Sequence, residues 1–445
     1  MKNVRETAVE LLEMMESKQS YSNLLLNNAI KNNKVLPKDI SLLTELVYGS
    51  LQRKITLDYM IRQFLKGNKK LELWVLQLLR ISVYQMFFLA KIPDRAVLFE
   101  AVEIAKKRGH KGIASLVNGV LRNLQRRGML SFASIKDPLE RLSIETSHPL
   151  WLIHRWTAQL GFAKTKQICE HNLTVPARTA RVNLNKITRE ECIRELENEN
   201  FQVQASDIIP EAIKSRNGNL ALSSAYKNGL LSIQDESSMI VAYALQPENG
   251  DKVLDACAAP GGKSTHIGEK LNNSGEIISL DIHEHKVKLI KEQASRLGLV
   301  NIHACALDSR RAQDHFPKES FDRILVDAPC SGLGVIRRKP EIKYTKTEAD
   351  IQKLSEVQQK ILQSVAPLLK KGGILVYSTC TIDKEENQTV IQTFLQQHPG
   401  FEANPAFTEK LPEKLKHAAT NYELQLFPGD FDTDGFYIAS LRKRV

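Results

Sequence analysis

The chain has 445 residues, a length that suits roughly three domains and excludes a peptide or a single small module. Hydrophobic residues make up 42% and charged residues 25%, as in folded globular proteins and unlike disordered or collagen-like chains. The net charge is +11, and residues 1–150, with 24 Lys and Arg against 14 Asp and Glu, contribute +10 of it. This asymmetry indicates either an anionic partner such as nucleic acid or a solvated basic face without a special role.

The N-terminus, MKNVRETAVELLEMM, lacks the apolar core of a secretory signal, so we expect a cytoplasmic protein. The most apolar long stretch, residues 71–90, contains Glu72, Gln77, Arg80 and Gln85. It predicts a buried helix and not a bilayer span. The six cysteines form no CxxC pair, so the sequence predicts reduced thiols, no metal site and no disulfide framework.

Residues 1–130 carry apolar side chains at helical spacing, with almost no strand signal. The pattern predicts an all-α domain over residues 1–140. Its basic residues fall into three clusters, namely Lys66, Lys69 and Lys70, then Lys106, Lys107 and Arg108, then Arg122, Arg126 and Arg127.

A second region begins where Pro138 and Pro149 interrupt the helical period. The segments ARTARVNLNK, FQVQA and LLSIQ are typical of strands. Thr188 and Glu191 form a capping-box pattern that predicts the start of a helix. Residues 141–236 therefore predict a small α+β module.

Residues 237–445 alternate short apolar runs with longer helical patterns, one of them from Glu348 to Lys370. The runs are KVLDA, EIISLD, NIHACAL, DRILVDA, GGILVYST and FYIASL. Alternation of this kind predicts a Rossmann-like α/β domain with a mostly parallel sheet covered on both faces. Ligands bind outside the carboxyl ends of the strands in such sheets.

The segment VLDACAAPGGKST, at the end of the first of these strands, has two interpretations. GGKST and the downstream ILVDAP resemble parts of a P-loop, which would indicate an RNA-stimulated NTPase that depends on Lys263. The position of the first P-loop glycine is Cys257, however, so the tight turn beneath the phosphates is missing. The other interpretation is a glycine turn that holds a nucleoside cofactor at a helix N-terminus.

Four aspartates follow four successive predicted strands: Asp255, Asp281, Asp308 and Asp327. Any one of them could simply cap the next helix. As a set they predict a carboxylate-rich rim that can accept ribose hydroxyls and suits the positive sulfonium of S-adenosylmethionine.

Two cysteines also follow strands, Cys330 in DAPCSGLG and Cys380 in YSTC. A lone cysteine is more often a small buried hydrophobe than a nucleophile, but two at neighbouring strand ends favour chemistry. A thiolate that adds to C6 of a pyrimidine makes C5 nucleophilic enough to accept a methyl group. Cations that could favour the thiolate are Lys263 and the run Arg337–Lys339.

VLDACAAPGGKS, ALDSRR, LVDAPCSGLG, YSTC and DGFYIA together resemble the motifs of RNA cytosine-5 methyltransferases. The paired PC and TC cysteines are the most specific part of the likeness. VRETAVELL, LVYGSLQRKITLD, IPDRAVLFEAVEIAK and LVNGVLRN resemble the NusB-like RNA-binding domain of the B-type small-subunit ribosomal RNA methyltransferases. HPLWLIHRW and RVNLNK resemble the middle module of that subfamily, so the likeness spans essentially the whole chain.

The resemblance implies methyl transfer from S-adenosyl-L-methionine to C5 of a cytosine in 16S rRNA, either naked or in a small-subunit assembly intermediate, with no membrane partner. It implies that Cys380 is the nucleophile and that Cys330 assists product release. The implied cofactor residues are the loop Cys257, Ala258, Ala259, Pro260, Gly261, Gly262 and Lys263, with Asp281 at the ribose, Asp308 at the adenine and Asp327 between cofactor and base.

This chain has RRKPEIKY where the family often shows RRxPDxxW, so Glu341 and Tyr344 concern the positioning of the target and not the chemistry. The basic first third, taken alone, is also compatible with a non-catalytic RNA-binding protein. The oligomeric state does not follow from the sequence.

Overall fold

The computed structural model describes residues 3–18, 22–32, 35–65 and 70–445. By packing, the chain divides into a helical unit, residues 1–174 and 336–345, and a sheet unit, residues 175–335 and 346–445. The sequence instead predicts three domains, residues 1–140, 141–236 and 237–445. The division by packing does not test these domain bounds, so they stay a prediction.

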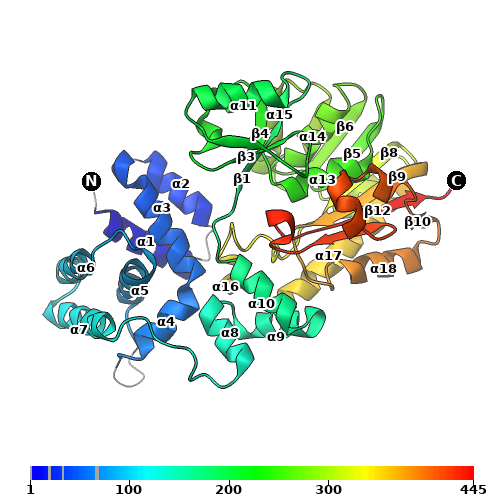
Figure 1. Ribbon diagram of the computed structural model, residues 1–445. Coiled ribbons are helices and arrows are strands. Elements are labelled where there is room, and N and C mark those ends of the chain that lie inside the picture. The colour runs from blue at the N-terminus through cyan, green and yellow to red at the C-terminus, as the bar shows by residue number, and fades with distance from the viewer. Residues whose placement is uncertain (1–2, 19–21, 33–34, 66–69) are drawn as a thin grey trace. The chain divides into compact units, whose positions relative to one another are not determined.

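The helical unit begins as the sequence predicts, with helix after helix and, in its described residues, no strand (Figure 1). The helices are α1 (Val4–Lys18), α2 (Ser22–Lys31), α3 (Ile40–Gln52), α4 (Lys54–Arg62), α5 (Leu73–Phe88), α6 (Asp94–Arg108), α7 (Lys111–Arg127), α8 (Pro138–Thr146), α9 (Leu150–Leu160), α10 (Phe162–His171) and α16 (Ile342–Thr345). Among the described residues, no helix combines the length and the apolar character that crossing a bilayer requires.

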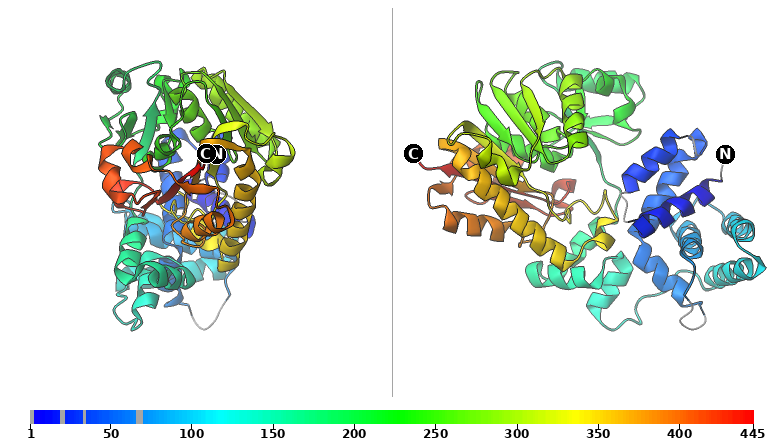
Figure 2. Two further views of the ribbon diagram at one scale, coloured as in Figure 1. Left: turned by 90° about the vertical axis from the view of Figure 1, so that its right-hand side faces the viewer. Right: turned by 180° about the vertical axis from the view of Figure 1, so that it is seen from behind.

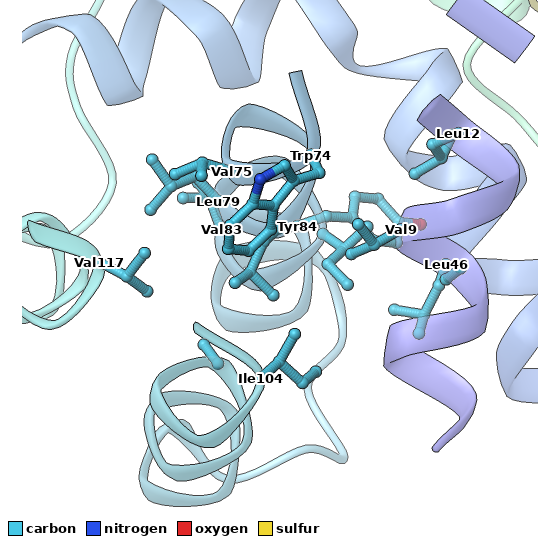
Figure 3. Packing of buried hydrophobic residues seen from close by; sticks show 14 of the residues in the cluster. Val9, Leu12, Leu46, Trp74, Val75, Leu79, Val83, Tyr84, Ile104 and Val117 are labelled. Atoms are coloured by element: carbon cyan, nitrogen blue, oxygen red, sulfur yellow. The ribbon is translucent and has the colours of Figure 1, made fainter. Parts of the chain in front are cut away.

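Helix α5 is the buried helix predicted over residues 71–90, and its apolar side chains contact the neighbouring helices on several sides (Figure 3). Arg80 is buried in this setting because it forms ion pairs with Asp58 and Glu16, each at 2.7 Å. A buried charge is tolerated when it is paired and hydrogen-bonded in this way. Arg80, the charged residue in the middle of the apolar stretch, is thus satisfied within a protein core.

The segment 336–345, which follows the Cys330 motif in the sequence, packs in the helical unit. Glu341 accepts hydrogen bonds from the backbone N–H of Ser22 (3.3 Å) and from its hydroxyl (2.9 Å). The Tyr344 hydroxyl lies 2.9 Å from both the Leu51 carbonyl oxygen and Ser147 Oγ. The two residues that depart from the usual family pattern are therefore anchors of this segment.

The basic clusters of the helical unit are exposed to different degrees. Lys66 and Lys69 lie outside the described residues. Lys107 pairs with Glu6 (2.9 Å) and Arg108 with Glu13 (2.6 Å). Arg122 and Arg126 lie four residues apart on the exposed surface of α7, as the spacing predicts.

The sheet unit contains a small antiparallel sheet with the order β2-β3-β1-β4. Its elements are β1 (Arg178–Val182), α11 (Arg189–Asn198), β2 (Val203–Ala205), β3 (Ala212–Ser215), α12 (Ser224–Lys227) and β4 (Leu231–Ile233). The capping box of Thr188 and Glu191 opens α11, which confirms that prediction. The four-residue β3 was not predicted.

The large sheet has the order β10-β12-β9-β8-β5-β6-β7, with β11 beside β12. Its strands are β5 (Lys252–Asp255), β6 (Glu276–Asp281), β7 (Ile302–Ala306), β8 (Phe321–Asp327), β9 (Leu369–Thr379), β10 (Phe401–Ala403), β11 (Glu423–Leu426) and β12 (Phe436–Lys443). Strands β5 to β9 are parallel, whereas β12 pairs antiparallel with β9, β10 and β11. All six predicted strands are present in this mixed, Rossmann-like sheet.

Helices cover both faces of the large sheet (Figure 1, Figure 2). They are α13 (Glu236–Leu245), α14 (Gly262–Lys270), α15 (Glu284–Leu297), α17 (Glu348–Val365), α18 (Gln388–Gln397) and α19 (Phe407–Lys410). Val253 packs in the cluster with α13 and α14, while its neighbour Leu254 packs in the cluster with α17 and α18, because successive strand side chains point to opposite faces. The helix predicted from Glu348 to Lys370 is too long, since Leu369 already begins β9.

Candidate active site

The candidate site lies at the carboxyl ends of the parallel strands. Strands β5 and β8 are hydrogen-bonded neighbours although two strands separate them in the sequence, so the connections leave in opposite directions at this point. Such a switch point opens a crevice that binds ligands. Asp255, Asp281 and Asp327 are the last residues of β5, β6 and β8, and Asp308 follows β7 by two residues.

The loop from Cys257 to Lys263 joins β5 to α14 and turns sharply. Gly261 adopts φ = +105°, and a Cβ atom there would lie 3.2 Å from Ile290 Cα, so only glycine fits without strain. A Cβ on Gly262, the first residue of α14, would meet no atom of the described residues within 4 Å. The first turn of α14 therefore leaves room for a ligand to approach its backbone N–H groups.

Asp255 is fully buried at the base of this loop. Its Oδ2 accepts a hydrogen bond from the Ser264 hydroxyl (2.6 Å), while its Oδ1 has no partner among the described residues. Burial raises the pKa of Asp255 to about 7, and the charge of Asp327 adds to the effect.

Asp255→Asn should change how the free energy of unfolding depends on pH. The folded protein holds the Asp255 proton up to about pH 7 and the unfolded chain releases it near pH 4, so this carboxyl group contributes stability at low pH that is lost as the pH rises. Asparagine does not titrate. The variant should gain about 2 to 4 kcal/mol relative to the wild type between pH 4 and pH 8 in urea unfolding curves. Asp314→Asn, an exposed site, is the control, and parallel profiles for Asp255→Asn and the wild type would contradict this prediction.

Asp281 and Asp308 border the same loop but differ in their own contacts. Asp281 accepts a hydrogen bond from the His283 backbone N–H (3.0 Å). Asp308 accepts one from the Arg310 backbone N–H (3.0 Å) and pairs with the guanidinium of Arg310 at 2.5 Å. It therefore caps the short turn that follows, as the simpler interpretation of the aspartates expects. Both oxygens of the Asp308 carboxylate thus already have partners in the protein.

Cys257 remains a thiol in this site. Burial raises its pKa well above the ordinary value, and the charges of Asp255, Asp327, Asp281 and Asp308 act in the same direction. All four aspartates therefore lie within electrostatic range of one sulfur atom. This convergence fits the prediction that Cys257 packs the loop and does not react.

Cys330 and Cys380 are brought together, with their Sγ atoms 3.4 Å apart. Cys330 follows β8 and Cys380 follows β9, and these strands are hydrogen-bonded neighbours. Both residues are half-buried. Two thiols in this arrangement can both contact the same group of a substrate.

Lys263 supplies the positive charge of the site. Its Nζ lies 2.6 Å from Asp327 Oδ2, and the Ser378 hydroxyl donates to the other Asp327 oxygen at 2.8 Å. Burial opposes the ammonium, but the negative charges of Asp327 and Cys380 raise the pKa of Lys263 overall. The same attraction stabilises a thiolate at Cys380. The other predicted cations, Arg337–Lys339, pack in the helical unit, where Arg337 contacts Thr174 Oγ1 at 3.5 Å.

The sequence analysis missed Glu386, a fully buried carboxylate six residues after Cys380. It accepts hydrogen bonds from the Ser331 backbone N–H (2.8 Å), the Ser331 hydroxyl and the Gln358 amide (3.1 Å). Ser331 is the residue after Cys330. The only signal in the sequence was an acidic run, KEE, just beyond the TC motif.

The charge of the crevice decides between the two interpretations of the GGKST loop. A triphosphate would face several carboxylates, and Lys263, the lysine that a P-loop uses for phosphates, is paired with Asp327. A sulfonium cofactor with ribose hydroxyls suits the same groups, and the open space at Gly262 can receive it. The residues present therefore fit S-adenosylmethionine and not a nucleoside triphosphate.

Comparison with known proteins gives the family of the chain. Residues 242–442 match the model of the 16S rRNA methyltransferase RsmB/F family, residues 2–126 that of the NusB family, and residues 148–218 that of the RsmF/B-like ferredoxin-like domain. A probable ribosomal RNA small subunit methyltransferase B from Bacillus subtilis (strain 168) is 54% identical over 442 residues, which is 99% of each chain.

Two solved structures extend the likeness. The crystal structure of PH0851 aligns with a TM-score of 0.81 at 28% identity, over 100% of this chain and 99% of that chain. A methyltransferase homolog from Pyrococcus horikoshii aligns with a TM-score of 0.58 at 30% identity, over 69% of this chain and 99% of that chain. The chain belongs to the 16S rRNA methyltransferase RsmB/F family.

Proposed function

We propose that the protein transfers a methyl group from S-adenosyl-L-methionine to C5 of a specific cytosine in 16S rRNA, through a covalent bond between Cys380 and C6 of that base. The observation that supports this most is the 3.4 Å separation of the Cys330 and Cys380 sulfur atoms at the ends of adjacent parallel strands. One thiol suffices for attack, so a second at this distance suits the release step.

The cofactor would lie along the rim of strand ends, where it supplies an electrophilic methyl group. The loop Cys257–Lys263 would approach it through the N-terminus of α14. Asp281 would hold the ribose hydroxyls, and Asp308, which already pairs with Arg310, would border the adenine. Asp327 would lie between cofactor and cytosine, held by Lys263 and Ser378.

The steps of the proposed reaction depend on the thiols of Cys380 and Cys330. The Cys380 thiolate, which Lys263 stabilises, adds to C6 of the cytosine. C5 of the resulting enamine would then attack the methyl carbon, and the bond between that carbon and the sulfonium sulfur would break, so that S-adenosylhomocysteine leaves with the electron pair. A base then removes the C5 proton, and the electron pair left behind expels the Cys380 thiolate from C6. Cys330, in contact with Cys380, would assist this last step. A paired cytosine must leave its stack before C6 can be reached.

The helical unit would bind the RNA. A groove of about 600 Å³ between α6 and α7 carries the basic side chains Arg95, Lys106 and Arg122 around Phe99, which is 64% exposed. Cations near an exposed aromatic ring suit phosphates beside an unstacked base. The proposed partner is 16S rRNA or a small-subunit assembly intermediate, and the proposed location of the reaction is the cytoplasm.

The test is methyl transfer itself. Incubation with methyl-labelled S-adenosylmethionine and unmethylated small-subunit RNA should place label in 5-methylcytosine at one position, which bisulfite sequencing of the same RNA locates. Fully methylated RNA is the matched control and should take up no label. Label at another atom or base, or no label with either naked RNA or assembly particles, would refute the proposal.

A further inference from the structure

We infer that Glu386 makes the two neighbouring cysteines chemically unequal: its carboxylate, bound to the turn that carries Cys330, holds Cys330 in the thiol form and leaves Cys380 to be the nucleophile. This inference rests on the proposed function, in which Cys380 attacks as a thiolate and Cys330 assists the release step. It assigns the choice between them to a residue that touches neither substrate nor cofactor, so Glu386 is a positioning residue.

The contacts of Glu386 join the two cysteine turns. The Ser331 backbone N–H donates to Oε1 at 2.8 Å, and the Ser331 hydroxyl donates to Oε2. The same hydroxyl lies 2.9 Å from Thr381 Oγ1, and Thr381 follows Cys380. One buried carboxylate therefore fixes the residue after each cysteine, which holds the two sulfur atoms at their short separation.

The two sulfur atoms have different electrostatic environments. The hydrogen bond with Cys380 and burial raise the pKa of Cys330, and the negative charge of Glu386 raises it further. The ammonium of Lys263 interacts with Cys380. Two thiolates 3.4 Å apart would repel each other, so only one forms at a time. The negative charge of Glu386 disfavours the thiolate at Cys330 and the positive charge of Lys263 favours it at Cys380, so Cys380 forms the thiolate.

Glu386 is poised to carry this charge near neutral pH. Burial and the charge of Asp383 raise its pKa to about 7, and the hydrogen bonds from Ser331 and Gln358 oppose the shift. Tyr377 donates its hydroxyl to the Glu386 backbone carbonyl oxygen (2.6 Å), and its own pKa is raised well above the ordinary value, so it stays neutral. Among the described residues, the titratable groups that interact with Glu386 include Asp383, Tyr377 and Cys330, and these three are acids.

The test is the reactivity of each cysteine in the full-length protein, without RNA or cofactor. Iodoacetamide labelling from pH 6 to pH 10, followed by peptide mass spectrometry, gives a rate for each thiol. In the wild type, Cys380 should react at a lower pH than Cys330. Glu386→Gln keeps the shape of the side chain without its charge, so the pH of half-maximal Cys330 labelling should fall by about one unit while that of Cys380 changes much less.

The chain offers matched controls. Glu385→Gln makes the same change one residue away and should leave both profiles as in the wild type. Cys305 is exposed, so its labelling rate shows how the reagent itself performs at each pH. Cys169 and Cys192 are buried and should stay unlabelled in every folded variant. An unchanged Cys330 profile in Glu386→Gln would overturn the inference. Cys330 reacting before Cys380 in the wild type would also overturn it. If Glu386→Gln unfolds, Glu386→Asp takes its place: the shorter side chain withdraws the carboxylate from the Cys330 turn, so the pH of half-maximal Cys330 labelling should fall, and an unchanged profile would overturn the inference. None of these outcomes depends on whether methyl transfer occurs.

Discussion

Cys380→Ala should lower the single-turnover rate of methyl transfer by about 10³-fold or more, because no thiolate is left to add to C6 and C5 then stays a poor nucleophile. The structure gives this expectation a geometric basis. Cys380 follows β9, half-buried, with Cys330 in contact and the charge of Lys263 acting on it. Labelled methyl incorporation into unmethylated small-subunit RNA, with enzyme in excess over RNA, measures the rate of the chemical step.

The matched control is Cys305→Ala, which removes an exposed thiol from β7 and should keep the wild-type rate. Cofactor binding provides a second control. Cys380→Ala should bind S-adenosylmethionine with an affinity close to that of the wild type, because the proposed cofactor residues are the loop Cys257–Lys263 and the aspartates. A variant that retained more than a tenth of the wild-type rate would show that Cys380 is not the nucleophile.

The parts of the site that follow directly from the sequence are those that strands position. A parallel strand delivers its last residue to one edge of the sheet, so Asp255, Asp281 and Asp327 could be assigned to that edge once the apolar runs were recognised. The proximity of Cys330 and Cys380 follows in the same way from the pairing of β8 and β9. Periodicity and strand order carry this information because they are regular.

Other features depend on contacts that no local pattern announces. Glu386 accepts a hydrogen bond from Ser331, which lies 55 residues earlier in the sequence. Glu386 stands in a turn, where no helical or strand periodicity predicts the direction of a side chain. The packing of residues 336–345 in the helical unit likewise depends on partners such as Ser22 and Ser147, which are far away in the sequence. Asp308 looked equivalent to the other aspartates, but its nearest cation, Arg310, uses part of its carboxylate.

Short strands were the other omission. Strands β3, β10 and β11, of four, three and four residues, were not predicted, although the side chains of β11 (ELQL) alternate between polar and apolar. Each of them pairs with a longer neighbour. Their positions therefore come from tertiary structure.

Cys330→Ala should leave attack intact and block release, so a covalent complex of protein and RNA should accumulate to about tenfold or more above the wild-type level. Cys380 keeps its place after β9 and the charge of Lys263, so it can still bond to C6. What disappears is the thiol 3.4 Å away that is proposed to help break that bond. Denaturing gel electrophoresis with labelled RNA measures the complex.

The double variant Cys330→Ala with Cys380→Ala separates this outcome from non-specific crosslinking, because it lacks both thiols and should form no complex. The two single variants together also test the direction of the assignment. If Cys380→Ala accumulated the complex and Cys330→Ala did not, Cys330 would be the nucleophile. The inference that the charges of Glu386 and Lys263 favour a thiolate at Cys380 would then be wrong. Because the sulfur atoms are in contact, position alone does not distinguish them, and only their different electrostatic environments predict which single variant traps the RNA.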